Sequence, residues 1–308
     1  MIDRPERSAL TTPGSNWRMI EKALASPADV VIIDLEDAVA PGQKVAARGQ
    51  VIRALRELDW GRKPRLFRIN ALDTPWFYRD LIEIVEQAGD ALDLIVVPKV
   101  NRPEDVHVLD TLLAQLELAG DLPRRIGLEV QIETAPGLVS CEAIAAASPR
   151  IEAVVFGPGD YAAAAGIPLT AIGAPDSWDQ VYPGHRFHYP MHRLLVAGRA
   201  AGTRVIDGPF AAIRDEAGLH RSCLMARALG YDGKWAIHPS QLPVINEVFS
   251  PSVEEVLWAT KVIAEYESAT YSGNGAIALD GVMLDAASIR MARSTLARTA
   301  VNAPERQR

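Results

Sequence analysis

Eight short apolar runs alternate with amphipathic segments along most of the chain, and this alternation limits the folds that it can adopt. The runs are Ala9–Thr12, Val30–Leu35, Arg65–Ile69, Leu92–Pro98, Ile126–Ile132, Ala153–Phe156, Arg204–Ile206 and Lys234–Ile237. Apolar strands that are joined by helices indicate a parallel sheet that is buried on both faces. Eight such units, at a spacing of roughly 30 residues, predict a closed (β/α)8 TIM-like barrel rather than an open sheet.

The segments between the runs have apolar residues at helical spacing. The expected helices are Trp17–Leu24, Lys44–Glu57, Asp80–Ala88, Pro103–Glu117, Leu138–Ala147, His192–Ala201 and Asp215–Leu229. Ser15 or Asn16 is expected to cap the first helix, because a short polar side chain can accept a hydrogen bond from a free N–H group at a helix start.

Two segments depart from the repeat. Ile167–Tyr189 is too long and too rich in Gly, Pro and aromatic residues for an ordinary barrel loop, so we expect a flap over the site or a contact between subunits. The chain also continues beyond a completed barrel, with helices expected at Ser252–Tyr266 and Asp285–Thr299. We therefore expect a barrel domain of residues 1–250 and a C-terminal helical extension of residues 251–308.

Composition narrows the class of protein. The net charge of −7 and the lack of a basic run argue against a nucleic-acid binder, which needs a positive footprint. No apolar run approaches the about 20 residues of a membrane span, and the N-terminus lacks the pattern of a secretory signal. Cys141 and Cys223 stand in no metal-binding spacing and are expected as core thiols in a reducing compartment. We expect a soluble, cytoplasmic protein.

Two neighbouring strands of the predicted barrel end in a carboxylate. Glu133 follows the run Ile126–Ile132, and Asp160 follows Ala153–Phe156 after Gly-Pro-Gly. An unpaired buried carboxylate is costly, whereas two of them at adjacent strand ends form an oxygen site that suits a hard divalent cation such as Mg2+. The alternative is that each acid caps the helix that follows it. We favour the metal site, because other strand ends carry matching chemistry.

Other strand ends supply further polar side chains, and in a barrel of this kind these ends form the active-site face. Arg68 can hold a developing enolate or carboxylate oxygen, or it can form a structural ion pair with Asp34 or Glu36. Glu36 and Asp37 are either supports or direct participants. A Schiff-base role for Lys99 is disfavoured, because nearby acids would raise its pKa.

Several common catalytic motifs are absent from the sequence. No serine stands in G-x-S-x-G, and no strand end carries a cysteine, so acyl-enzyme chemistry lacks a nucleophile. Neither of the glycine-rich loops that bind nucleotide phosphates is present. His238 follows the last strand, where it either closes the barrel or joins the site.

Six motifs lie at or after the ends of the predicted strands. They are Asp34-Leu35-Glu36-Asp37-Ala38-Val39-Ala40-Pro41, Arg68-Ile69-Asn70, Pro98-Lys99-Val100, Ile132-Glu133-Thr134-Ala135, Gly157-Pro158-Gly159-Asp160 and Trp235-Ala236-Ile237-His238-Pro239. Together they resemble the citrate lyase β-subunit-like (HpcH/HpaI aldolase) family. Other stretches resemble its malyl-CoA lyase subgroup: Leu58–Lys63, Leu72–Pro75, Gln87–Asp90 and Val248–Pro251.

The resemblance implies an enzyme that uses Mg2+, or Mn2+ in its place, to cleave a carbon–carbon bond of a 3-hydroxyacyl-CoA reversibly. Its small-molecule partners would be a CoA thioester and a 2-oxoacid. Glu133 and Asp160 would hold the metal, and Arg68 would stabilise the acetyl-CoA enolate next to Glu36 and Asp37. The residues implied to contact the substrate or CoA are Arg7 at a CoA phosphate, Gly157, Pro158 and Gly159 at the oxoacid carboxylate, and His238.

The resemblance also gives the C-terminal extension a role. The acid/base residue would be Asp285, with Asp280 as the weaker candidate, and it would act in the site of a neighbouring subunit. This implies a homotrimer or homohexamer in which the extension packs on a neighbouring copy.

The expected substrate is malyl-CoA, which would be split into acetyl-CoA and glyoxylate. Citramalyl-CoA and β-methylmalyl-CoA are alternative substrates, and malyl-CoA thioester hydrolysis is an alternative reaction. A citrate lyase β-type subunit that only binds CoA esters is a further alternative. Residues 175–189 do not closely resemble the family pattern, which leaves the identity of the substrate open rather than the type of chemistry.

Overall fold

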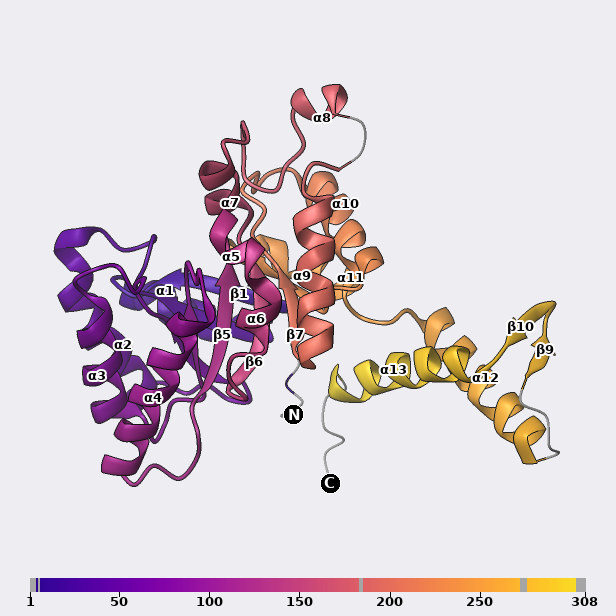
Figure 1. Ribbon diagram of the computed structural model, residues 1–308, viewed down its shortest axis with the longest axis horizontal. Coiled ribbons are helices and arrows are strands. Elements are labelled where there is room, and N and C mark those ends of the chain that lie inside the picture. The colour runs from indigo at the N-terminus through magenta and orange to yellow at the C-terminus, as the bar shows by residue number, and fades with distance from the viewer. Residues whose placement is uncertain (1–3, 5, 183–184, 272–275, 303–308) are drawn as a thin grey trace. The chain divides into compact units, whose positions relative to one another are not determined.

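The computed structural model describes residues 4, 6–182, 185–271 and 276–302, and its larger unit is a closed parallel barrel (Figure 1). The strands follow chain order around the barrel as β1 (Ser8–Pro13), β2 (Val30–Asp34), β3 (Arg65–Arg68), β4 (Leu94–Val97), β5 (Gly127–Ile132), β6 (Ile151–Phe156), β7 (Arg204–Asp207) and β8 (Gly233–Ala236). The ring closes where Leu10 of β1 pairs with Ala236 of β8. The predicted TIM-like barrel is confirmed.

Helices lie in the chain between successive strands, as Figure 1 shows. They are α1 (Trp17–Leu24), α2 (Lys44–Glu57), α3 (Phe77–Ala88), α4 (Pro103–Ala119), α5 (Ala135–Val139), α6 (Cys141–Ala145), α7 (Pro158–Ala165), α8 (Trp178–Val181), α9 (His188–Ala201), α10 (Glu216–Leu229) and, after β8, α11 (Leu242–Val248). Short 3-10 turns, η1 (Pro41–Gln43) and η2 (Pro239–Gln241), precede α2 and α11. Asn16 caps α1 as expected, accepting a hydrogen bond from Met19 N at 3.2 Å.

One predicted helix is broken. The stretch Leu138–Ala147 was expected to be continuous, but the chain forms α5 and α6 on either side of Ser140. The N–H of Ser140 donates to the carbonyls of Pro136 and Gly137, which closes α5. With φ −103° and ψ 6°, Ser140 then leaves the helical path before α6 begins.

The interior of the barrel is apolar at mid-height and charged at its carboxyl end. One cluster of buried side chains fills it: Ala9, Val30, Ile32, Leu66, Leu94, Val96, Ala153, Val155, Ile206 and Trp235. Side chains two residues apart on a strand share a face. Asp34 follows Ile32 by two residues and Arg68 follows Leu66 by two, so both face the same interior. The packed core therefore supports a layer of charged side chains at the strand ends.

The long segment between α7 and α9 is held together by an arginine. Arg186 pairs with Asp176 at 2.9 Å and with Asp179 at 2.8 Å, and its side chain is only 9% exposed. Its Nη1 also donates to the carbonyl of Pro168. These bonds join both ends of the irregular segment around α8. Its expected role, as a flap or a subunit contact, stays a prediction.

A second compact unit contains, among the described residues, residue 4 and residues 247–271 and 276–302. Its elements are α12 (Val253–Tyr271), β9 (Ile277–Leu279), β10 (Val282–Leu284) and α13 (Ala286–Asn302). The two expected helices are present, and an unexpected antiparallel hairpin lies between them. Asp280 and Gly281 form its two-residue turn with φ of +50° and +81°, the backbone of a tight hairpin turn. A small core holds the unit together: Ala259, Val262, Leu284, Ile289 and Ala292.

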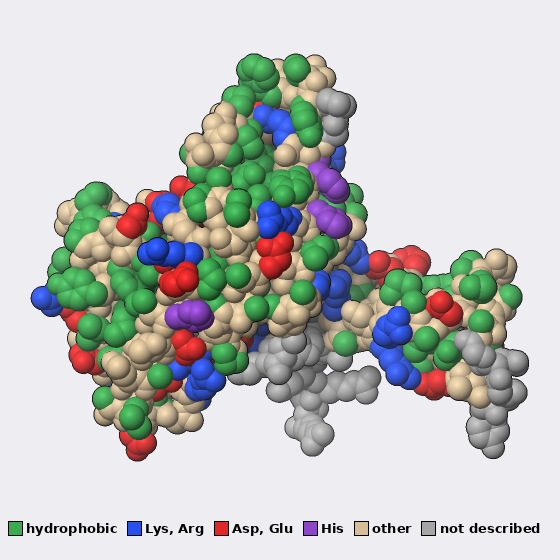
Figure 2. Space-filling view, in the orientation of Figure 1, with side chains coloured by type: hydrophobic (Ala, Val, Ile, Leu, Met, Phe, Trp, Pro, Cys, Tyr) green, Lys and Arg blue, Asp and Glu red, His purple; other side chains and the backbone are tan. Residues whose placement is uncertain are grey.

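The surface is mixed in charge. On the face in Figure 2, Lys and Arg side chains are interspersed with Asp and Glu rather than gathered into a basic patch. Among the described residues, no helix is both long enough and apolar enough to cross a membrane. Cys141 and Cys223 are buried, free thiols, and burial raises the pKa of each to about 11 and about 12, as expected for core positions.

Candidate active site

A buried ion pair links the ends of β2 and β3. Arg68 donates from Nε to Asp34 Oδ1 and from Nη2 to Asp34 Oδ2, both at 2.7 Å. The same carboxylate accepts the backbone N–H groups of Glu36 and Ala38 at 2.9 and 3.0 Å. Burial alone would raise the pKa of Asp34, but Arg68 and these N–H groups outweigh it and hold the pKa below its usual value. Asp34 is therefore a fixed anion that orients Arg68.

Arg68 keeps donor capacity beyond this pair. Its Nη1 lies 3.1 Å from Glu36 Oε2 and donates to Gln131 Oε1 at 3.4 Å. A guanidinium has five N–H donors, and three of them make the hydrogen bonds to Asp34 and Gln131. The structural ion pair that the sequence suggested is thus present, and it coexists with donors that can meet a substrate oxygen.

Glu133 is linked to Arg68 through Gln131. Gln131 accepts from Arg68 and donates from Nε2 to Glu133 Oε2 at 3.2 Å. The other oxygen, Glu133 Oε1, accepts the backbone N–H of Lys99 at 2.8 Å. Burial raises the pKa of Glu133 to about 8, against the effect of Arg68 and with the help of Asp160 and Glu36. A nearby cation would stabilise the anionic form of the Glu133 carboxyl group.

Lys99 lies among the acidic side chains that follow β2 and β6. Its Nζ forms an ion pair with Glu36 and lies 3.5 Å from Asp37 Oδ1 and 3.8 Å from Asp160 Oδ1. Burial alone would lower the pKa of Lys99, but Glu36 and Asp37 raise it well above its usual range. A lysine that is protonated so firmly is a poor nucleophile, which argues against a Schiff base.

Glu36 and Asp37 differ in environment although they are neighbours in the chain. Glu36 is buried, and burial raises its pKa against the pull of Arg68 and Lys99. The Asp37 side chain is 58% exposed and reaches Lys99 only at 3.5 Å. Both were predicted as site residues, and the structure places Glu36 between the two cations and Asp37 at its outer edge.

The start of α7 brings Gly157 against Glu133. Gly157 is the N-cap of this helix and Asp160 lies in its first turn. The first N–H groups of a helix have no partner within it, so those of Gly159 and Asp160 can bind a carboxylate or another anion. Gly159 packs against Ile172, where a Cβ would lie 2.8 Å from Ile172 Cδ1. The geometry suits a carboxylate that lies next to the Glu133 and Asp160 side chains.

These residues fit a divalent cation. Glu133 and Asp160 are close enough for the charge of Asp160 to raise the pKa of Glu133. The described residues contain no group of three or more His, Cys, Asp and Glu side chains that could hold a metal. Mg2+ commonly takes only one or two carboxylates and completes its shell with water or substrate oxygens. The donor set therefore suits Mg2+ better than a metal that needs a complete cage of protein ligands.

Three predicted site residues do not join this group. Arg7 precedes β1 and binds Asp29 through Nε at 2.8 Å and Nη2 at 2.7 Å, which places it at the opposite end of the strands. His238 is exposed, and its Nδ1 accepts the N–H of Ser240 at 3.2 Å. Asp285 belongs to the second unit, where it caps α13 by accepting the N–H of Ala287 at 2.8 Å.

Two residues of the site were missed as contributors. Gln131 precedes Glu133 by two residues on the same strand, so alternation alone would have placed both side chains on one face. Lys99 was considered only as a nucleophile. The backbone of Lys99 has a φ of +52°, in the left-handed region that is uncommon for residues other than glycine. No sequence pattern predicted this conformation.

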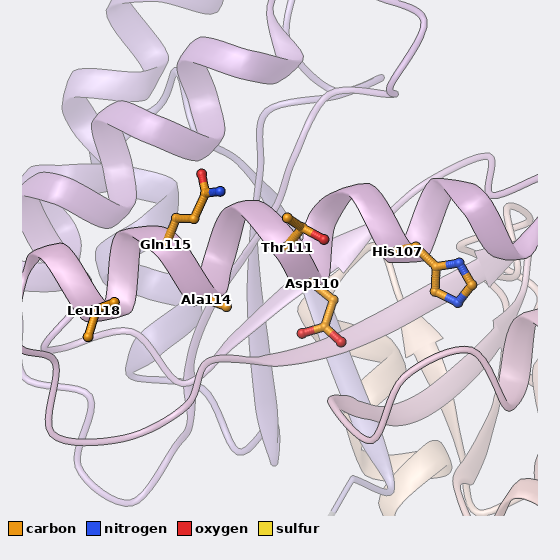
Figure 3. A pocket seen from close by; sticks show the side chains of 6 residues that line it. All are labelled: His107, Asp110, Thr111, Ala114, Gln115 and Leu118. Carbon is orange, nitrogen blue, oxygen red and sulfur yellow. The ribbon is translucent and has the colours of Figure 1, made fainter.

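A separate surface hollow contains few groups that could take part in catalysis. It lies on the outer face of α4, has a volume of about 590 Å3 and is lined by six side chains of that helix, labelled in Figure 3: His107, Asp110, Thr111, Ala114, Gln115 and Leu118. Its one carboxylate, Asp110, is paired with Arg150 at 2.5 Å and accepts from Ser148. The strand-end group, with its clustered charges, is the better candidate.

Comparison with known proteins agrees with this geometry. The family model HpcH/HpaI aldolase/citrate lyase matches residues 7–239, which include Arg68, Glu133 and Asp160. The chain belongs to this family. The match spans every barrel strand but leaves the second unit outside it.

The names of similar proteins refer to malyl-CoA or to coenzyme A. An L-malyl-CoA/β-methylmalyl-CoA lyase from Cereibacter sphaeroides is 42% identical over 94% of this chain and 93% of its own length. A (3S)-malyl-CoA thioesterase from the same organism is 38% identical over 96% and 94%. A solved structure of the protein CitE from Mycobacterium tuberculosis, in complex with magnesium, acetoacetate and coenzyme A, has a TM-score of 0.76 at 31% identity, covering 96% of this chain and 98% of that one.

Proposed function

We propose that this protein is a Mg2+-dependent carbon–carbon lyase that cleaves malyl-CoA reversibly to acetyl-CoA and glyoxylate. The observation that carries the proposal is the hydrogen-bonded link from Arg68 through Gln131 to Glu133, since it joins the proposed enolate-stabilising cation to the proposed metal-binding carboxylate. The 42% identity to a malyl-CoA lyase over nearly the whole chain supports the substrate class.

The reaction needs a general base, a group that stabilises the negative charge of the enolate, and a binding site for the oxoacid. Loss of the substrate's hydroxyl proton starts the cleavage, and the electron pair of the carbon–carbon bond passes to the thioester as an enolate. The hydroxyl-bearing carbon becomes the carbonyl of glyoxylate. The enolate then takes a proton at carbon and becomes acetyl-CoA. In the reverse direction the same groups act in the opposite order.

Arg68 is suited to the enolate oxygen. Two hydrogen bonds to Asp34 fix the guanidinium of Arg68, so its positive charge is oriented before the substrate binds. Preorganised charges of this kind are worth most in a site that excludes water. Glu133 and Asp160 would hold Mg2+, which would supply Lewis-acid chemistry to the site. The free N–H groups at the start of α7 hold the oxoacid carboxylate.

Asp285 is the proposed acid/base residue, acting in the site of a neighbouring copy of the chain. Backbone N–H groups of Ser288 and Ala287 lower the pKa of Asp285, so these hydrogen bonds stabilise its anionic form. It is exposed in the second unit, a position that is open to a partner. The proposed assembly is a homotrimer or homohexamer, which light scattering after size-exclusion chromatography would determine.

Thioester hydrolysis is the second candidate, because the (3S)-malyl-CoA thioesterase relative is 38% identical over 96% of this chain. In that reaction the same residues would direct water to the thioester carbonyl instead of releasing glyoxylate. Citramalyl-CoA and β-methylmalyl-CoA remain alternative substrates, since one methyl group changes binding by only about 1–3 kcal/mol.

The deciding experiment follows products from malyl-CoA, β-methylmalyl-CoA and citramalyl-CoA in parallel, each with Mg2+ and with EDTA. Metal-dependent release of acetyl-CoA and glyoxylate from malyl-CoA supports the proposal. Free CoA with malate would make the enzyme a thioesterase. Pyruvate from citramalyl-CoA at a higher rate would reassign the substrate. No product from any of them would leave a CoA-ester-binding subunit as the better description.

A further inference from the structure

Lys99 lies where two acidic segments converge. Its Nζ pairs with Glu36 and lies 3.5 Å from Asp37 Oδ1, both in the segment after β2. It also lies 3.8 Å from Asp160 Oδ1, in the first turn of α7. Asp160 is one of the two carboxylates that fit a divalent cation. The ammonium group of Lys99 is therefore already close to a proposed metal ligand.

The backbone of Lys99 holds the other ligand. Its N–H donates to Glu133 Oε1 at 2.8 Å, and this direction depends on the left-handed backbone with φ of +52°. Glycine adopts that conformation without strain, whereas a side chain disfavours it. One residue thus contacts both proposed metal ligands, Glu133 through its main chain and Asp160 through its side chain.

The balance of charges in the site bears on the contact between Lys99 and Asp160. Five carboxylates lie in the site, and three cationic side chains face them among the described residues: Arg68, Lys99 and Lys44, whose Nζ donates to the carbonyls of Leu35 and Glu36. The carboxylates are Asp34, Glu36, Asp37, Glu133 and Asp160. Arg68 is committed to Asp34 and Glu36. Lys99 is the cation nearest to Asp160 among the described residues, and its side chain is 29% exposed, which leaves room for its end to move.

We propose that Lys99 is a positioning residue that sets the affinity of the divalent-cation site, its backbone fixing Glu133 while its ammonium group competes with the cation for Asp160. This inference rests on the proposed function only in assuming that Glu133 and Asp160 bind a divalent cation. The ammonium group and the divalent cation oppose each other because like charges that share one carboxylate repel in a partly buried site. When the cation binds, the ammonium group stays with Glu36 and Asp37.

A purely structural lysine predicts the opposite result. If Lys99 only held the acidic segments together, its removal would loosen Glu133 and Asp160 and weaken cation binding. If it competes with the cation, loss of its charge tightens binding while the backbone bond to Glu133 persists. The sign of the change therefore separates the two roles.

The test measures Mn2+ binding to metal-depleted protein by electron paramagnetic resonance, without substrate. Lys99→Met removes the charge at similar length, and Lys99→Gly removes it while favouring the left-handed backbone. Both should bind Mn2+ about tenfold more tightly than wild type, because one repelling charge is lost. Lys99→Arg keeps the charge and should bind as wild type does. Lys22→Met, on the exposed face of α1, is the matched charge control and should change nothing.

Unchanged or weaker binding in both Lys99→Met and Lys99→Gly would overturn the inference, provided that circular dichroism shows either variant to be folded. If wild type itself bound no Mn2+, the cation site of the proposed function would fail and this inference with it. Wild-type binding without a gain in the variants would overturn the role of Lys99 alone. The two failures are thus distinguishable.

Discussion

Gly157 lies directly against Glu133, so closely that a Cβ at position 157 would stand 2.2 Å from Glu133 Oε2 and 2.4 Å from its Cβ. These separations are far below van der Waals contact, so only glycine fits here unless Glu133 moves. The contact joins the end of β6 to the end of β5. It couples Glu133 to the start of α7, the helix that carries Asp160 in its first turn.

Gly157→Ala should therefore damage the cation site. The added methyl group has to displace the Glu133 carboxylate, and overpacking of this kind costs about 1–3 kcal/mol. We expect Mn2+ affinity to fall at least about tenfold, and lyase activity at subsaturating Mg2+ to fall with it. Titration of metal-depleted protein measures the first effect, and excess Mg2+ should restore part of the second.

The control for that variant is Gly49→Ala in α2. A Cβ at Gly49 would meet nothing within 4 Å, and the position is inside a helix. Alanine there should stabilise the protein by about 0.5–1 kcal/mol and leave Mn2+ affinity unchanged. If Gly157→Ala also kept its Mn2+ affinity, Glu133 would not be a ligand that depends on this contact.

Gln131→Leu tests the link between the enolate cation and the metal ligand. Leucine has a similar volume but can neither accept from Arg68 nor donate to Glu133. We expect kcat to fall about tenfold, because both groups lose the partner that orients them, a loss of roughly 1.4 kcal/mol in transition-state stabilisation. Steady-state kinetics measures the change. An unchanged kcat would show that Asp34 alone orients Arg68.

Several residues of the candidate site could be predicted from the sequence. Arg68, Glu133 and Asp160 were predicted as site residues because they stand at or just after the carboxyl ends of apolar runs, and barrel topology brings such ends together. Asp34 was expected only as a possible ion-pair partner of Arg68. Arg7 was assigned to CoA only by resemblance. As a residue that precedes β1, it lies at the other end of the strands, where Asp29 binds it.

Other features depended on contacts that a sequence does not display. The role of Lys99 follows from a left-handed backbone that only the folded chain reveals. Helix α7 was not predicted, because its run of alanines has no amphipathic period. The hairpin of β9 and β10 did carry a signal, Asp280-Gly281, which is typical of a two-residue turn. The features that the sequence did not predict are thus a left-handed backbone conformation, a short helix and a short hairpin.

The Asp34–Arg68 pair predicts how stability depends on pH. The pKa of Asp34 is lower in the folded protein than its ordinary value, so the pair contributes its full stabilisation above the ordinary pKa of about 3.9. That contribution is lost as pH falls through the lower, folded-state pKa. Removing one partner of a buried pair costs about 3–5 kcal/mol, and we expect a loss in this range for Asp34→Asn near pH 7.

Urea unfolding between about pH 2 and pH 7 measures this effect, because the loss occurs below the ordinary pKa of Asp34. The free energy of unfolding of wild type should decrease toward acid more steeply than that of Asp34→Asn, because the variant has already lost the titrating partner. Equal slopes for the two proteins would mean that other carboxylates, rather than Asp34, dominate the acid limb.

Shared sites between copies can be tested by mixing two inactive variants. Arg68→Ala lacks the enolate-stabilising cation and Asp285→Asn lacks the proposed base, so each alone should be nearly inactive. When both are co-expressed with different affinity tags, a site formed by the barrel of an Asp285→Asn copy and the extension of an Arg68→Ala copy contains both functional residues. Random assembly should then restore about a quarter of the wild-type activity over all oligomers, and about a third in cyclic trimers that contain both variants. Purification through both tags excludes unmixed oligomers, and activity at the level of the separate variants would mean that each chain completes its own site.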